Sequence, residues 1–112
     1  MKKNEYRAEL EKATPVLQEL IIAPASKQEE ILHSVDSSIV RTVVVMMCMG
    51  KNSIDNHRKK PYKHPIDVLK SWDEHIPGSY ATIDKKGDIE YMLGKGYMNH
   101  ALRTSMHLLS IF

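Results

Sequence analysis

The side chains best suited to contact a partner lie in a basic stretch at residues 51–64. It carries five cations with histidine and tyrosine side chains between them: Lys51, His57, Arg58, Lys59, Lys60, Tyr62, Lys63 and His64. Clustered cations displace counterions from nucleic acid and an aromatic ring can stack on a base, so residues 57–64 suit a phosphate backbone. An acidic protein surface would be contacted by the same charges. A solvated loop has a similar composition, and no known nucleic-acid-binding motif accompanies this one, so both classes of partner stay open.

The histidines do not have the spacing of a metal site. There are six of them: His33, His57, His64, His75, His100 and His107. None forms the i, i+4 pair that would place two ligands on one face of a helix. His100 and His107 are seven residues apart, which in a helix is a rise of about 10 Å and too far for one ion. We therefore expect structural histidines, and neither a metal nor a cofactor.

Catalytic signatures are equally scarce. Cys48 lies among valine and methionine residues, where an apolar setting raises the thiol pKa and disfavours the reactive thiolate. The segment Gly94-Lys95-Gly96 lacks the rest of a phosphate-binding loop and is better explained as a turn between helices. Acidic pairs such as Asp73 and Glu74 stand beside lysines, as solvated charges do. We expect no catalytic residues, and a protein that is not an enzyme.

Methionine is abundant, with seven residues in 112. Its side chain is flexible and polarisable, so that clusters of it can form adaptable binding surfaces. The candidates for an apolar interface are Met46, Met47, Met49, Met98 and Met106. Core filling is favoured for most of them. If neighbouring helices leave part of the central segment uncovered, that face predicts a contact with a partner or with a second copy of the chain.

Length and composition indicate one globular domain, residues 1–112, that folds unaided. A single cysteine excludes an intramolecular disulfide, which fits a reducing cytoplasm. Charged residues follow Lys2 and Lys3 where a signal peptide would need an apolar stretch. The longest apolar run, Val43–Met49, is far shorter than the roughly 20 residues that cross a bilayer as a helix. We therefore expect a cytoplasmic protein without a membrane segment.

Caps, breaks and apolar spacing predict an all-α bundle of five or six helices around a central apolar helix at about residues 37–49. A first helix runs over residues 2–13, and Thr14-Pro15 either starts a new helical turn or kinks this first helix. The capping box Ser26-Lys27-Gln28-Glu29 predicts a helix from Lys27. Further helices are expected at residues 65–76, from Asp88 to Leu93, and from Met98 onward.

A buried strand is the alternative for the central segment, since Val43-Val44-Val45 also has strand propensity. Helix is favoured because capping candidates at residues 36–38 and Gly50 enclose about a dozen residues, which is long for a strand. Gly50 is expected to end this helix. Residues 51–64 then form a long basic loop.

Three segments resemble an uncharacterised family of short bacterial proteins, known as a domain of unknown function. They are Val44-Val45-Met46-Met47-Cys48-Met49-Gly50-Lys51, then Trp72, and finally Tyr91-Met92-Leu93-Gly94-Lys95 leading into Met98-Asn99-His100-Ala101-Leu102. The similarity covers roughly the C-terminal two-thirds of the chain. It implies a helical fold and adds no activity. The basic residues from Arg58 to Lys63, and Gly96 where proline is expected, depart from that pattern.

These observations favour a small, non-enzymatic helical interaction protein that binds a larger protein stoichiometrically. Domains of this kind include bacterial or phage inhibitors such as anti-CRISPR and toxin-immunity proteins. The alternative is a nucleic-acid-binding module that uses residues 57–64.

Overall fold

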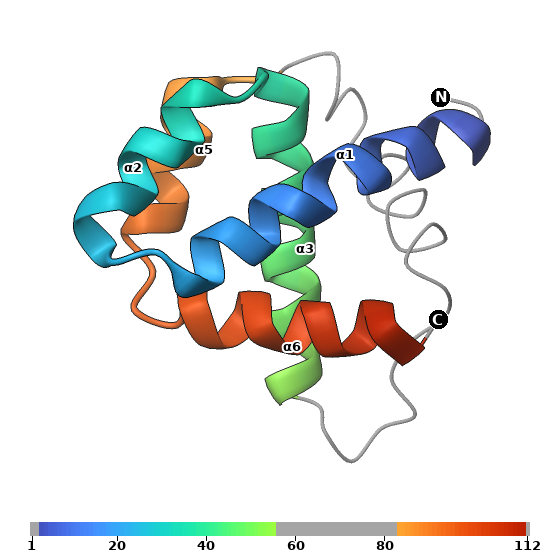
Figure 1. Ribbon diagram of the computed structural model, residues 1–112. Coiled ribbons are helices and arrows are strands. Elements are labelled where there is room, and N and C mark those ends of the chain that lie inside the picture. The colour runs from blue at the N-terminus through green and yellow to red at the C-terminus, as the bar shows by residue number, and fades with distance from the viewer. Residues whose placement is uncertain (1–2, 56–82, 112) are drawn as a thin grey trace.

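The computed structural model describes residues 3–55 and 83–111, which form five helices (Figure 1). These are α1 (Lys3–Ile22), α2 (Ala25–Ser34), α3 (Ser37–Asp55), α5 (Lys85–Leu93) and α6 (Met98–Ile111). The two described ranges contain no strand. The all-α prediction is therefore confirmed, and Val43–Val45 is helical. The helix expected at residues 65–76 lies outside the described residues.

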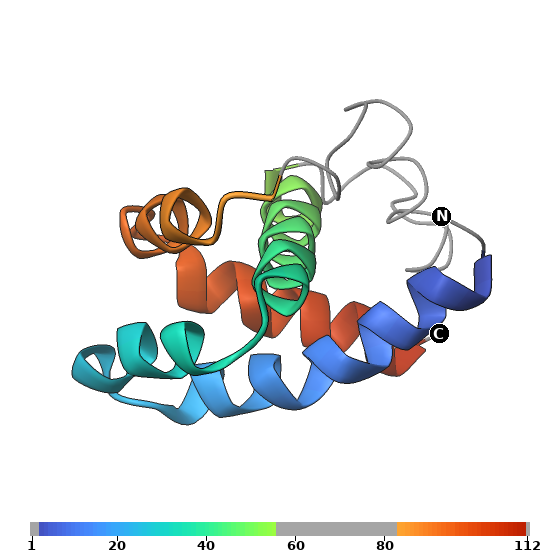
Figure 2. The same cartoon turned by 90° about the horizontal axis from the view of Figure 1, so that it is seen from above.

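The α3 helix is the centre of the molecule. Helices α1, α5 and α6 pack against it, with α6 making the most extensive contact, and Figure 2 shows α1 and α6 crossing it on the same side. Residues 42–47 of α3 are all buried. Burying a valine or methionine side chain contributes roughly 1.5–3 kcal/mol, so this stretch holds the bundle together. The prediction of a central apolar helix beginning at Ser37 is confirmed.

The predicted end of α3 at Gly50 is wrong, because the helix continues to Asp55. Gly50 lies inside the helix where α3 crosses α6, and a Cβ added to it would overlap the carbonyl oxygen of Ala101. Beside this contact, the Ser105 hydroxyl donates a hydrogen bond to the Met46 carbonyl. The glycine therefore permits a close helix crossing. Consequently, residues 51–55 are helical and do not belong to a loop.

Of the two outcomes expected at Thr14-Pro15, the start of a new helix is wrong, since α1 is one helix with Pro15 inside it. Thr14 does not cap a new helix: its hydroxyl donates to the carbonyl of Leu10, 2.8 Å away. Pro15 faces solvent, while Ala13 and Val16 on either side of it are buried. The apolar face of α1 is thus continuous through the proline. Packing of that face on α3 and α6 keeps the helix whole although Pro15 donates no backbone hydrogen bond.

The α2 helix begins at Ala25, without the capping box expected at residues 26–29. Gln28 is one of the two middle residues of that pattern, which take no part in capping, and here it is buried. Its amide donates to the Leu20 carbonyl at 3.0 Å and to the Asn99 side chain at 2.7 Å. These two bonds connect α2 to the end of α1 and to the first turn of α6.

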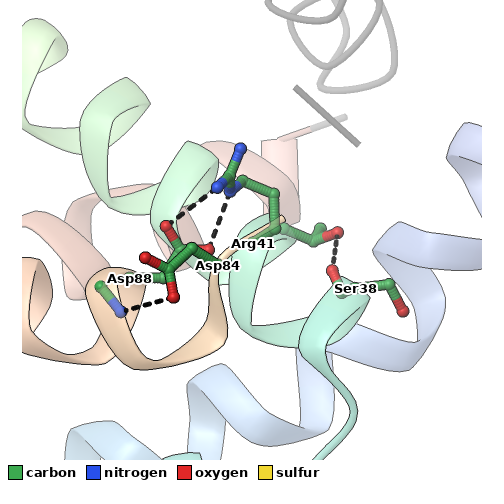
Figure 3. Close-up of polar contacts among 6 residues, drawn as sticks. Ser38, Arg41, Asp84 and Asp88 are labelled. Carbon is green, nitrogen blue, oxygen red and sulfur yellow. Dashed lines mark hydrogen bonds and ion pairs between the residues drawn. The ribbon is translucent and has the colours of Figure 1, made fainter. Parts of the chain in front are cut away.

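The α5 helix begins at Lys85, three residues before the predicted cap at Asp88. Its cap is Asp84, which accepts a hydrogen bond from the Gly87 amide at 3.1 Å (Figure 3). Asp88 instead receives two bonds from Arg41 of α3, Nε to Oδ2 at 2.8 Å and Nη2 to Oδ1 at 3.1 Å. Both side chains are at most 14% exposed. This bidentate ion pair fixes α5 against the central helix.

Candidate functional site

The described residues hold little that could carry out catalysis. Within residues 3–55 and 83–111, no three histidine, cysteine, aspartate or glutamate side chains are grouped so that they could hold a metal ion. Burial raises the pKa of the Cys48 thiol, and this outweighs the opposing effects of the Tyr91 hydroxyl and of Lys95. The thiol is therefore protonated at neutral pH and is a poor nucleophile. The remaining candidates are surfaces that could contact another molecule.

Most of the predicted basic site cannot be placed. Seven of its eight residues lie outside the described residues and stay predictions: His57, Arg58, Lys59, Lys60, Tyr62, Lys63 and His64. Lys51 is described, and it is half-buried on α3. Its ammonium group lies 4.7 Å from the centre of the Tyr97 ring. The predicted site thus begins on a helix and contacts an aromatic residue from the C-terminal part of the chain.

The methionines predicted as an apolar interface are mostly core residues. Met46 and Met47 are fully buried, and Met49 and Met98 are buried as well. Only Met106, on α6, is partly exposed. The reason is that α1, α5 and α6 cover the central helix. In this structure the first four side chains fill the core, and a partner could reach only the exposed part of Met106.

The most distinctive surface feature is a tyrosine–lysine patch, formed by Lys51, Tyr91, Lys95 and Tyr97. Lys51 comes from α3, Tyr91 from α5, and Lys95 and Tyr97 from the connection between α5 and α6. The Lys95 ammonium lies 4.8 Å from the centre of the Tyr91 ring, which matches the pairing of Lys51 with Tyr97. Tyr91 is 41% exposed. Two cation–π pairs therefore lie together at the surface.

A short connection between two helices holds the patch in place. The α5 helix ends at Gly94, whose amide donates to the Glu90 carbonyl at 3.0 Å. The Lys95 amide then donates to the Met92 carbonyl at 3.1 Å, and its carbonyl accepts from the Met98 amide at 3.1 Å. Met92 and Met98 are both buried. The turn predicted at residues 94–96 is thus confirmed, and core residues anchor both of its ends.

The two tyrosines and Cys48 share a network of polar contacts. The Cys48 sulfur lies 3.9 Å from the Tyr91 hydroxyl oxygen. Partial burial, together with the neighbouring Cys48 and the hydroxyl of Tyr97, raises the pKa of Tyr91 above its ordinary value. At neutral pH the Cys48 thiol and the Tyr91 phenol are therefore uncharged. The patch thus presents a phenol hydroxyl beside two ammonium groups. Such a surface can donate hydrogen bonds to carboxylates and attract them electrostatically.

Three of the four patch residues were missed from the sequence as site residues. Tyr91 and Lys95 are four apart, a spacing that places side chains on one helical face and could have drawn attention to them. The pairing of Lys51 with Tyr97 joins α3 to the segment before α6. No local pattern reveals such a contact, because it depends on how the helices pack.

A second surface feature is a groove at the corner between α1 and α2. It has a volume of about 480 Å³. We call it the α1–α2 groove, and its lining residues are Glu19, Ile22, Ala23, Pro24, Lys27, Glu30, Ile31 and Ser34. Ile22, the last residue of α1, is 84% exposed. Ile22 lies two residues after the buried Leu20, off the apolar face of α1, and no local pattern in the sequence predicts the groove beside it.

No family model, curated protein or solved structure matches this chain. The resemblance to a family of short bacterial proteins therefore stays a prediction. None of the described helices has the length and apolar character needed to span a membrane.

Proposed function

We propose that the protein works by stoichiometric binding to a larger protein, and that the tyrosine–lysine patch contacts an acidic segment of that partner. The observation that carries the proposal is the patch itself, in which Tyr91 is exposed and two ammonium groups lie on tyrosine rings. Tyrosine is enriched at protein interfaces and among the residues that contribute most to binding. A ring that already holds a cation also loses less conformational freedom when a partner binds.

The charge of the patch favours an acidic partner. The ammonium groups of Lys51 and Lys95 and the hydroxyl of Tyr91 can all donate to carboxylates. A few residues beyond Lys51 the chain carries Arg58 and Lys59, which the sequence predicts to extend this positive charge. Opposite charges on the two partners would speed their association and exclude proteins of like charge.

Binding to nucleic acid is less well supported by the geometry. Proteins that bind single strands stack bases on open aromatic faces. Here Lys51 covers one face of the Tyr97 ring and Lys95 covers one face of the Tyr91 ring. A base that stacked on either of these covered faces would have to displace the lysine from it. The alternative function therefore depends on residues 57–64, which are not described.

The inhibitor class expected from the sequence is consistent with this mode of action. A protein that acts by occupying a partner's surface needs neither a nucleophile nor a metal. Anti-CRISPR and toxin-immunity proteins act in this manner, and the proposal includes a role of that kind in the cytoplasm of a bacterium, encoded by its own genome or by a phage. Under this proposal the protein is not an enzyme.

The test is affinity capture from a nuclease-treated bacterial lysate, followed by calorimetry with the protein recovered. We expect one binding stoichiometry, and an affinity about tenfold lower for Tyr91→Ala and for Lys95→Glu. The matched control is Lys86→Glu, an exposed lysine of α5 outside the patch, which should change the affinity by less than about threefold. Recovery of nucleic acid alone from an untreated lysate would refute the proposal, as would equal binding by all variants.

A further inference from the structure

Ile22 is an unusual residue to leave in water. Among the large apolar side chains that are described, it is by far the most exposed, at 84%, and Tyr91 follows at 41%. It projects from the end of α1 beside Ala23 and Pro24, and all three line the α1–α2 groove. A protruding apolar side chain and a hollow of about 480 Å³ thus occur on the same small surface.

We propose that two copies of the chain associate through this surface, with Ile22 of each copy packed into the α1–α2 groove of the other. Two-fold dimers use the same patch on both copies, so the patch must be complementary to itself. A knob next to a hollow satisfies that requirement, because one rotation places each knob in the opposite hollow. Ile31, half-buried on the groove wall, supplies apolar contact for the incoming side chain.

The charges around the groove are also self-complementary. Glu19 lies on the α1 side and Lys27 on the α2 side. Lys27 makes an exposed contact of 3.5 Å with Glu30 of its own helix, while Glu19 has no ion-pair partner among the described residues. A two-fold rotation that exchanges the two sides brings Lys27 of one copy toward Glu19 of the other. A strongly acidic partner would meet repulsion from Glu19 and Glu30, the two carboxylates that line the groove.

The dimer surface is separate from the tyrosine–lysine patch. Figure 2 shows α2 and α5 on opposite sides of the start of α6. The first turn of α6 contacts α2 through the bond between Gln28 and Asn99, whereas Tyr97 before it belongs to the patch. Association through the groove would therefore leave both patches accessible. A dimer would present two partner-binding surfaces, so that it could bind a repeated or dimeric partner with avidity.

The experiment is sedimentation equilibrium of the full chain from about 1 μM to about 1 mM, a range that covers weak, small interfaces. We expect the mass to rise from that of the 12.8 kDa monomer toward twice that value. Ile22→Glu places a charge in the groove and should raise the dissociation constant at least tenfold. The matched control is Leu93→Glu, which alters a 38% exposed apolar residue on α5 and should leave the dissociation constant unchanged.

A charge exchange tests the arrangement of the two copies. Glu19→Lys and Lys27→Glu should each weaken the dimer by about threefold, since each puts like charges across the two-fold axis. The double variant restores opposite charges and should recover most of the affinity. Circular dichroism checks that every variant remains folded. A monomer throughout the concentration range would overturn the proposal, as would a dimer that tolerates Ile22→Glu or a double variant weaker than both single ones.

Discussion

Replacing Gly50 by alanine tests the packing on which this fold depends. In an isolated helix the change would be favourable, because alanine is preferred over glycine in a helix interior by roughly 0.8–1 kcal/mol. At this position the added Cβ would overlap the carbonyl oxygen of Ala101 and lie only 2.8 Å from its carbonyl carbon and from the Ser105 hydroxyl. Two of these three atoms are backbone, and no rotamer change moves them away. The α6 helix must therefore shift outward.

That shift has a cost that can be worked from the contacts. Forcing a methyl group into a packed interface costs typically about 1–3 kcal/mol, and the rigid backbone favours the upper end. Separating the helices by about 0.5–1 Å forfeits a quarter to a half of each dispersion contact across them. The hydrogen bond from Ser105 to the Met46 carbonyl can persist through a shift of this size. After subtracting the gain in helix propensity from the upper part of the overpacking range, we expect a loss of about 1 to 2 kcal/mol.

Urea unfolding followed by circular dichroism measures this loss. The midpoint should fall while the slope m stays the same, which marks a change in stability without a change in the unfolding mechanism. The matched control is Gly96→Ala, since a Cβ at Gly96 meets nothing within 4 Å, and its effect should be within about 0.5 kcal/mol. If Gly50→Ala were as stable as the wild type, or more stable, the close crossing of α3 and α6 would be refuted.

Two further predictions concern the α3–α5 contact and the patch. Asp88→Asn should lower the free energy of unfolding by about 2 kcal/mol, because it removes the negative charge that the largely buried Arg41 guanidinium contacts through two hydrogen bonds. Lys27→Ala, which removes a pair with Glu30 whose side chains are 64% and 73% exposed, should cost less than about 0.5 kcal/mol; equal losses would contradict the assigned role of the Asp88 pair. Alkaline titration of tyrosinate absorbance should show one phenol titrating above the ordinary pKa of about 10, and Tyr91→Phe should remove that component. Because the raised pKa belongs to the folded state, the stability it contributes is present below about pH 10 and is lost as the pH rises further. Above about pH 10 the free energy of unfolding of Tyr91→Phe should therefore fall less steeply with pH than that of the wild type. A titration unchanged by Tyr91→Phe would contradict the assignment.

The helices were predictable where their signals are local. Ser37 as the first residue of α3, and Met98 as the first of α6, follow from capping residues, a glycine-containing break and apolar spacing. The same kind of signal failed at Pro15 and Gly50. Either residue can end a helix or can remain inside one, and the choice depends on what packs against it. Pro15 stays inside α1 because the apolar face of that helix is continuous, and Gly50 stays inside α3 because Ala101 packs closely against it. Both features depend on tertiary packing.

The candidate site was less predictable than the fold, for a related reason. A run of cations is visible in a sequence, so Lys51 was found. Its pairing with Tyr97 was not, because the two residues meet only when α3 and α6 cross. For the methionines, the sequence leaves two environments open. Composition cannot distinguish a methionine that fills a core from one that faces a partner, and Met46 and Met47 proved to be fully buried.

The way the patch is built has a consequence for its binding energetics. Tyr97 directly precedes Met98, which is buried, and Tyr91 directly precedes Met92, which is fully buried. The backbone of both tyrosines is thus fixed by the core, while each ring is held by a lysine and Tyr91 also by its contact with Cys48. Ordering flexible side chains costs roughly 0.5–1.5 kcal/mol for each one that a partner must immobilise. A patch already ordered by the core would avoid much of this cost in the proposed contact with an acidic partner, so fewer favourable contacts would be needed for a given affinity.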